Sequence, residues 1–187
     1  MTKFHFAAGS IVGLALVVGL ALAGENVKSG PQVGEKVPGP FHPMNVTGES
    51  AGEKACLYCK NGSNPVAMIF ARDCSDNLTA LIKKIDECTA KNKDSKMGSF
   101  VVFLSDSEEL GKQLKAMAEK EGIKQTVLSI DNPAGPAAYK VSKEADVTVV
   151  LYTDHVVKAN HAFARGELKE DNIAQIINDV STILPKE

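Results

Sequence analysis

Residues 65–77 read PVAMIFARDCSDN, and this stretch decides the fold. Its first seven residues form a short, continuous apolar run, which is typical of a strand covered on both faces of its sheet. The run stops at residues 72–76, a cluster rich in side chains that cap helices. A buried strand that leads through one short turn into a helix begins a β-α-β unit, and Cys74 lies in that turn.

The rest of the chain continues this alternation. After the turn, apolar residues recur with helical spacing and predict an amphipathic helix that ends near Lys91. Strands are predicted over residues 99–104, 125–130, 147–152 and 156–163, the last two as a hairpin. Helices are predicted over residues 107–121 and 168–184, and Gly122 ends the first of them. The predicted fold class is α/β, with a central mixed sheet, helices on both faces, and a C-terminal hairpin followed by a helix.

The first 23 residues have the pattern of a secretory signal peptide. Lys3 supplies the positive charge, residues 7–23 are apolar and uncharged, and the stretch closes on the small-x-small pattern ALA at residues 21–23. It is short for a membrane span, which needs about 20 apolar residues. We expect cleavage between Ala23 and Gly24, export to the periplasm or the medium, and no stable membrane anchor afterwards. A retained anchor is the alternative.

After the signal peptide, 164 residues remain, enough for one domain with its own core. Residues 24–39 are rich in Gly, Pro, Lys and Glu and are expected to form a flexible lead-in to a domain over residues 40–187. The whole chain has 21 basic and 23 acidic residues, and loss of the signal peptide leaves a net charge of about −3. This balance argues against a nucleic-acid partner and against binding to anionic lipid. The oligomeric state is left open.

Four cysteines in an oxidising compartment favour disulfides. Cys56 and Cys59 form a CxxC motif that lies before the first core strand, and it could be a small-loop disulfide, half of a metal site or a relocated redox pair. Zinc would need two further ligands, and the sequence has no second CxxC and no HxxxH. Lys60 follows the motif where covalent haem attachment needs His. We therefore expect a disulfide, structural or exchangeable, and no metal or other cofactor.

Cys74 is the candidate catalytic nucleophile. A thiol at the N-terminus of a helix has a lowered pKa because the helix dipole stabilises thiolate. Asp73 and Asp76 act in the opposite direction, because negative charge disfavours thiolate. The sequence leaves this balance open, and an idle, inherited cysteine is the alternative. Cys88 lies 14 residues further along the same helix, about 21 Å away, so it cannot pair with Cys74 and is expected to be a small core residue.

Four segments, in this order, resemble the thioredoxin-like superfamily, specifically the branch shared by peroxiredoxins and exported bacterial TlpA-like redoxins. Residues 32–48 (QVGEKVPGPFHPMNVTG) resemble its opening, and residues 70–74 (FARDC) resemble the strand end that presents the active cysteine. Residues 105–139 resemble its helix–strand insertion, and residues 147–170 its final hairpin. The resemblance implies a thioredoxin-like fold and thiol–disulfide chemistry at Cys74.

The active-site motif departs from the family's pattern, so the resemblance implies a degenerate site. The second thiol of a CxxC that begins at Cys74 is replaced by Asn77, and the Trp that commonly precedes the motif is replaced by Asp73. The cis-Pro of the family should fall at Asp146 or the following residue, and neither is Pro. A peroxidase would have Thr where Ala71 stands.

Three functions follow from these observations. The leading hypothesis is an exported thiol–disulfide oxidoreductase that uses Cys74, acts on protein thiols or disulfides, and has the Cys56–Cys59 pair as an electron partner. The competing hypothesis is a non-catalytic thioredoxin-like module that binds a partner protein through the same surface. A thiol peroxidase, with Cys74 as its peroxidatic thiol and Cys56 or Cys59 as its resolving thiol, is the third. A Cys74 sulfur within disulfide range of either CxxC sulfur would favour exchange.

Overall fold

The computed structural model describes residue 1 and residues 27–185, so the expected signal peptide beyond Met1 and the expected cleavage position at Ala23 and Gly24 lie outside the described residues. One six-stranded sheet with the strand order β1-β4-β3-β2-β5-β6 forms the centre of the domain. Strands β2, β3 and β4 are parallel, and β1, β5 and β6 pair antiparallel to their neighbours. The predicted α/β class with a mixed sheet is therefore confirmed.

The elements in chain order are β1 (Met44–Asn45), α1 (Leu57–Asn61), β2 (Val66–Ala71), α2 (Asp76–Lys91), β3 (Gly98–Leu104), α3 (Leu110–Glu121), β4 (Val127–Asp131), the 3-10 turn η1 (Ala137–Tyr139), β5 (Val147–Thr153), β6 (Val156–Phe163), α4 (Glu170–Asp179) and the 3-10 turn η2 (Val180–Thr182).

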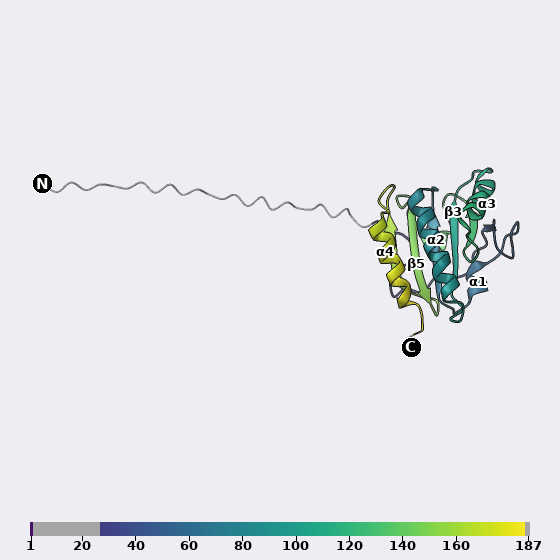
Figure 1. Cartoon of the computed structure of the whole chain (residues 1–187), viewed down its shortest axis with the longest axis horizontal. Helices are drawn as coiled ribbons and strands as arrows, with labels where there is room; N and C mark the ends of the chain where they lie inside the picture. The colour runs from purple at the N-terminus through teal and green to yellow at the C-terminus, as the bar shows by residue number, and fades with distance from the viewer. Residues whose placement is uncertain (2–26, 186–187) are drawn as a thin grey trace.

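The sheet separates two apolar cores. Helices α2, α3 and α4 cover one face, and α2 and α4 lie side by side on it (Figure 1). The other face is covered by shorter pieces of chain: Val37, Phe41, the helix α1 and Tyr139 of η1. All six residues of β2 are buried because this strand lies at the centre of the sheet and is covered on both faces. This explains the continuous apolar run in the sequence.

Local chemistry sets the ends of the helices close to their predicted positions. Ser75 caps α2, and its side chain accepts a hydrogen bond from the backbone N–H of Leu78 at 3.2 Å. Gly122 ends α3 with φ 71°, a left-handed conformation that glycine adopts without steric cost. The last helix is shorter than predicted, because α4 ends at Asp179 and one 3-10 turn continues the apolar stripe to Ile183.

Asp86 of α2 holds the chain at the entry to β4. Its side chain is largely buried, and one carboxylate oxygen accepts hydrogen bonds from three successive backbone N–H groups, those of Lys124 at 3.0 Å, Gln125 at 2.7 Å and Thr126 at 2.7 Å. No strand supplies acceptors for these donors, so the carboxylate satisfies a turn that would otherwise leave them unpaired.

Residues 29–37, part of the segment expected to be a flexible lead-in over residues 24–39, contact the sheet. Buried Ser29 hydrogen-bonds Thr148 of β5 at 2.7 Å through the two hydroxyl groups. The backbone N–H of Gly34 donates to the carbonyl of Val157 at 2.9 Å, and that of Val37 donates to the carbonyl of His155 at 2.8 Å. The physical reason is that β6 is an edge strand, whose unpaired backbone groups this segment satisfies. Residues 29–37 thus pack against the domain that was expected over residues 40–187.

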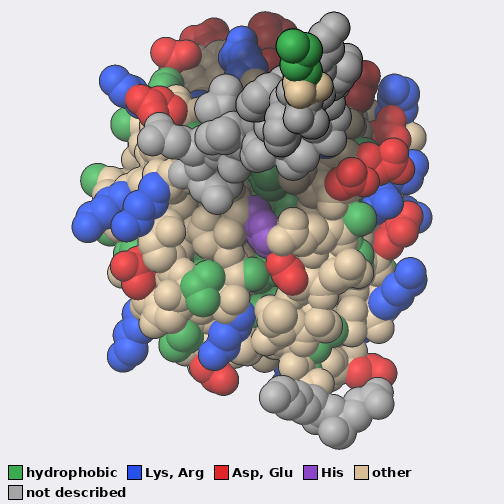
Figure 2. Space-filling model, turned by 90° about the vertical axis from the view of Figure 1, so that its left-hand side faces the viewer, with side chains coloured by type: hydrophobic (Ala, Val, Ile, Leu, Met, Phe, Trp, Pro, Cys, Tyr) green, Lys and Arg blue, Asp and Glu red, His purple; other side chains and the backbone are tan. Residues whose placement is uncertain are grey.

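Charges of both signs are interspersed over the surface. Figure 2 shows Lys and Arg side chains alternating with Asp and Glu around one face, with no broad patch of a single sign on it. This agrees with the nearly balanced composition of 21 basic and 23 acidic residues. Among residues 27–185, no helix combines the length and the apolar character needed to cross a membrane.

Candidate functional site

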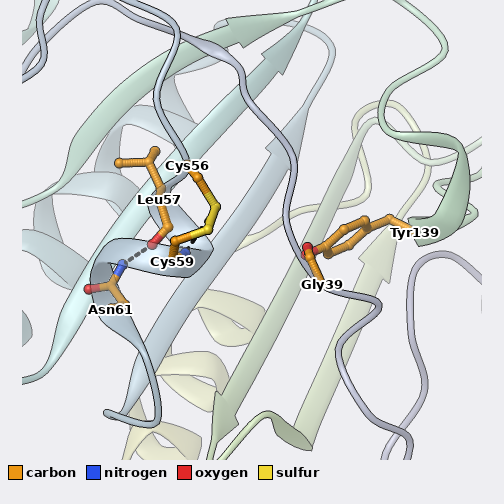
Figure 3. Close-up of a disulfide and its surroundings, with 6 residues drawn as sticks. All are labelled: Gly39, Cys56, Leu57, Cys59, Asn61 and Tyr139. Carbon is orange, nitrogen blue, oxygen red and sulfur yellow. Dashed lines mark hydrogen bonds between the residues drawn. A yellow bond between two sulfur atoms is a disulfide. The ribbon is translucent and has the colours of Figure 1, made fainter.

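The CxxC motif is closed by a disulfide. The Cα atoms of Cys56 and Cys59 lie 5.2 Å apart and their sulfurs are bonded to each other (Figure 3). Cys56 is the N-cap of α1, and its sulfur accepts a hydrogen bond from the backbone N–H of Cys59 at 3.0 Å. Cys59 is exposed, whereas Cys56 is half-buried. As a whole residue, Cys59 is therefore more open to solvent than Cys56.

The two residues between the cysteines hold α1 on the sheet. Leu57 is buried in the second core, and the ring of Tyr58 packs against His155 at 5.0 Å and Tyr152 at 6.5 Å between centroids. The α1 helix also comes close to the start of β3, because Asn61 lies where a side chain of residue 98 would be. A Cβ on Gly98 would collide with the side-chain oxygen of Asn61, so a larger residue there would require the Asn61 side chain to move.

A small cavity of about 50 Å³ lies beside the disulfide. It lies between α1 and the segment that follows β1, and Cys56 forms part of its wall together with Asn45 and Thr47. On its outer side, Lys60 and Glu49 form an exposed ion pair at 3.0 Å. The volume is enough for at least one water molecule.

Cys74 has no partner of this kind. It is exposed and lies one residue before Ser75, the N-cap of α2, so it stands outside the helix. None of the hydrogen bonds among the described residues reaches its sulfur, and its backbone N–H donates to the side chain of Asp73 at 2.8 Å. Partial burial raises the pKa of the Cys74 thiol, and the negative charge of Asp73 raises it further. Both of these effects favour the neutral thiol.

The positions around Cys74 that depart from the family pattern have structural partners of their own. Asn77, where the second thiol would stand, donates a hydrogen bond to the carbonyl of Leu168 at 2.9 Å and so links α2 to the segment before α4. Asp146 directly precedes β5, where the family's cis-Pro was expected. Burial raises the pKa of the Asp146 carboxyl, the nearby Asp73 adds to the rise, and the positive charges of Arg165 and Arg72 oppose it.

Arg72 ties down the segment that faces the Cys74 turn. Its guanidinium donates hydrogen bonds to three carbonyls, those of Ala145 at 3.1 Å, Pro133 at 2.6 Å and Ser142 at 3.1 Å. Its backbone N–H also donates to the carbonyl of Asp146 at 2.9 Å. One side chain therefore holds three points of the segment before β5. Sequence reasoning did not single out Arg72, although an Arg at the end of an apolar strand was visible there.

The two thiol centres lie at opposite ends of the sheet. The disulfide helix α1 precedes β2 and packs near the hairpin turn, through the contact of Tyr58 with His155. Cys74 follows β2 at the end where Ala71 pairs with Val147, the first residue of β5. The six residues of β2 alone separate these ends by about 17 Å at 3.3 Å per residue. Disulfide formation needs Cα atoms within about 7 Å, so this fold does not let Cys74 exchange directly with Cys56 or Cys59.

Cys88 is half-buried against the core that α2 helps to form, as expected of a small core residue. Partial burial raises the pKa of its thiol; the positive charge of Lys91 opposes this rise, and Glu87 adds to it more weakly. Within residues 27–185, no group of three or more His, Cys, Asp and Glu side chains is arranged to hold a metal ion.

No protein-family model matches the sequence, and no curated protein matches it significantly. Solved structures do match the fold. A DsbF homologue from Corynebacterium diphtheriae superposes with a TM-score of 0.61 at 13% identity, covering 82% of this chain and 90% of that one. The fold is thioredoxin-like.

Two further structures support this assignment. A secreted disulfide oxidoreductase of Mycobacterium tuberculosis, homologous to DsbE of E. coli, gives a TM-score of 0.56 at 10% identity and covers 76% of this chain and 95% of that one. The 2-Cys peroxiredoxin of Plasmodium vivax gives 0.57 at 15% identity, covering 81% and 83%. Identities this low establish a common thioredoxin-like fold and leave the chemistry to be argued from the residues themselves.

Proposed function

We propose that the protein is an exported thiol–disulfide oxidoreductase of thioredoxin-like fold, and that its exchanging group is the Cys56–Cys59 disulfide. Export is inferred from residues 1–23, which carry the signal pattern, and from the retention of a disulfide, which belongs to an oxidising compartment. The likeness to disulfide oxidoreductases, one of them secreted, is in keeping with this proposal.

The single observation that carries the proposal is the asymmetric exposure of the disulfide. Cys59 is exposed, while Cys56 is half-buried and its sulfur accepts the N–H of Cys59 at 3.0 Å. Thiol–disulfide exchange needs one sulfur open to attack and the other able to leave as a stabilised thiolate. This pair meets both requirements, whereas Cys74 has no second thiol and its pKa is raised.

The exchange proceeds in two steps. A substrate thiolate attacks the Cys59 sulfur, the bond between Cys59 and Cys56 breaks, and Cys56 leaves with the electron pair as a thiolate. The second thiolate of the substrate then attacks the substrate's first sulfur, which is bonded to Cys59 in the mixed disulfide, and Cys59 is released as a thiolate. The substrate dithiol is oxidised to a disulfide, and the protein disulfide is reduced by the same two electrons. The substrate's two protons end on Cys56 and Cys59 through solvent.

Equilibration of the mature protein with glutathione buffers, followed by alkylation and mass analysis, tests the proposal. We expect a reduction potential above about −300 mV for the Cys56–Cys59 pair, since structural disulfides of secreted proteins fall below that value. The Cys74→Ser variant is the matched control and is expected to leave the potential unchanged. A potential below about −300 mV would contradict the proposal, and a loss of exchange in Cys74→Ser would restore Cys74 as the nucleophile.

A second candidate function, a non-catalytic binding surface at the Cys74 end, is favoured by the contacts of Arg72 and Asn77. These side chains bond to backbone carbonyls and so are engaged in structure where the family keeps its reactive groups. On this second candidate, we expect little disulfide reductase activity in a standard insulin assay, because Cys74 cannot release a mixed disulfide through a neighbouring thiol. Strong insulin reduction that survives the loss of Cys56 and Cys59 would contradict both candidates.

A further inference from the structure

Asn45 is buried without a hydrogen-bond partner for its side chain. Only 1% of its surface is exposed, and neither the oxygen nor the nitrogen of its carboxamide has a partner among the described residues. Its backbone is fully used, because its N–H donates to Glu53 at 2.9 Å and its carbonyl accepts from Gly52 at 2.8 Å. The missing partners therefore concern the side chain alone. An unpaired buried amide is costly to the fold and is uncommon in native proteins.

The register of the sheet places this side chain on the same face as the disulfide helix. Asn45 pairs with Ser129, so its side chain lies on the same face as that of Ser129 and, two residues away along β4, that of Val127. Val127 packs into the core that also contains Leu57 of α1. Asn45 and Cys56 both line the cavity of about 50 Å³ beside the disulfide. Asn45, with its unpaired carboxamide, and half-buried Cys56 thus line the same small cavity.

We propose that the Asn45 carboxamide donates a hydrogen bond, directly or through one water in this cavity, to the Cys56 thiolate that forms when the disulfide opens. The inference rests on the proposed exchange at Cys56–Cys59 and adds a further residue to that site. In the disulfide state the Cys56 sulfur is a weaker acceptor than a thiolate would be, and the amide nitrogen of Asn45 has no partner there. After attack at Cys59, the electron pair of the broken bond resides on Cys56, and the amide N–H meets a charged acceptor.

This arrangement makes Cys56 the better leaving group. The backbone N–H of Cys59, in α1, already donates to the Cys56 sulfur at 3.0 Å. The Asn45 carboxamide, in β1, would supply a second donor. Two donors to one thiolate favour its charged form and lower its pKa. A lower pKa of the leaving thiol speeds exchange.

The test measures the alkylation rate of Cys56 against pH in the mature Cys59→Ser protein, resolved by peptide mass. Cys59→Ser leaves Cys56 without its partner thiol and keeps the backbone N–H of residue 59. We expect Asn45→Ala and Asn45→Leu to raise the midpoint for Cys56 by about one pH unit, a tenfold smaller thiolate fraction below the midpoint. Ser50→Ala, at another polar side chain that lines the same cavity, is the control and is expected to leave the midpoint unchanged.

Asn45→Leu also separates a chemical role from a structural one. Leu has nearly the shape of Asn and no unpaired polar atoms, so its thermal unfolding temperature is expected to equal or exceed that of the parent. An unchanged Cys56 midpoint in both variants would overturn the inference and leave Asn45 as the site of a structural water. If the disulfide of the parent protein resists glutathione while the Asn45 variants still shift the midpoint, the proposed function fails and the contact stands.

Discussion

Removing the Cys56–Cys59 disulfide is expected to cost the protein little stability. The bridge spans a sequence separation of 3 and so closes a loop of four residues. For a loop of this length, the lost entropy of the unfolded chain is about 6 cal/mol/K, which gives about 1.9 kcal/mol at 25 °C. Because folding and disulfide formation are linked, the same free energy makes the disulfide only about 20-fold more favourable in the folded protein than in the unfolded chain. This factor corresponds to about 40 mV in reduction potential. A bridge that stabilises so weakly is suited to opening and closing.

Urea unfolding of the oxidised mature protein and of the Cys56→Ser/Cys59→Ser variant, followed by circular dichroism, measures this cost. We expect a difference of about 2 kcal/mol with an unchanged dependence on urea concentration. Cys74→Ser is the control and is expected to change the free energy of unfolding by less than about 0.5 kcal/mol, because the residue is exposed and unpaired. A loss of about 4 kcal/mol or more, or an unfolded double variant, would refute the reasoning and assign the disulfide a structural role.

Three further predictions concern charged groups. The alkylation midpoint of Cys74 is expected at or above that of a free thiol, and Asp73→Asn should lower it, because partial burial and the Asp73 charge both raise the thiol's pKa. Iodoacetamide kinetics against pH measure this midpoint, and a value below that of a free thiol is the contrary result. Asp86→Ala should destabilise the protein by about 3–5 kcal/mol, because three backbone N–H groups lose their acceptor. Urea unfolding measures this loss of stability. A loss below about 1 kcal/mol would show that water replaces the carboxylate. The raised pKa of Asp146 means that its protonated form is favoured in the folded state, so its stabilising contribution is full in acid and is lost as the pH rises through the folded pKa. Asp146→Asn should therefore raise the unfolding temperature at pH 7 and leave it nearly unchanged near pH 3, and a difference that grows in acid would reverse this sign.

Much of the candidate site could be predicted from the sequence, but the distances between its residues could not. The CxxC spacing predicted a disulfide between Cys56 and Cys59, and the structure joins them. The hypothesis that this motif is the electron partner of Cys74 requires the thiols to be close in space, which the sequence does not show. In the structure, strand β2 lies between them. Asn45 gave a faint signal, a polar side chain between Met44 and Val46, yet its lack of a hydrogen-bond partner depends on every neighbour around it.

The sequence alone determined the order and type of the long elements. Periodic patterns depend on which face of an element is buried, and the long helices that pack against this sheet carry a period of 3.6 in their own residues. The apolar run 65–71, the cap at Ser75 and the stop at Gly122 are local features of this kind, and each lies within a residue or two of its expected place.

Only the tertiary structure decided what the functional groups are near. The segment over residues 29–37 looked flexible because its composition is polar and rich in Gly and Pro, yet it is held by the free edge of β6, more than 100 residues away along the chain. The five-residue helix α1 is likewise too short to be stable by itself and exists because Leu57 and Tyr58 are buried on the sheet. Hydrogen bonds and burial between distant residues carry no periodic signal, so the fact that Asn45 and Cys56 line one cavity is settled only when the chain has folded.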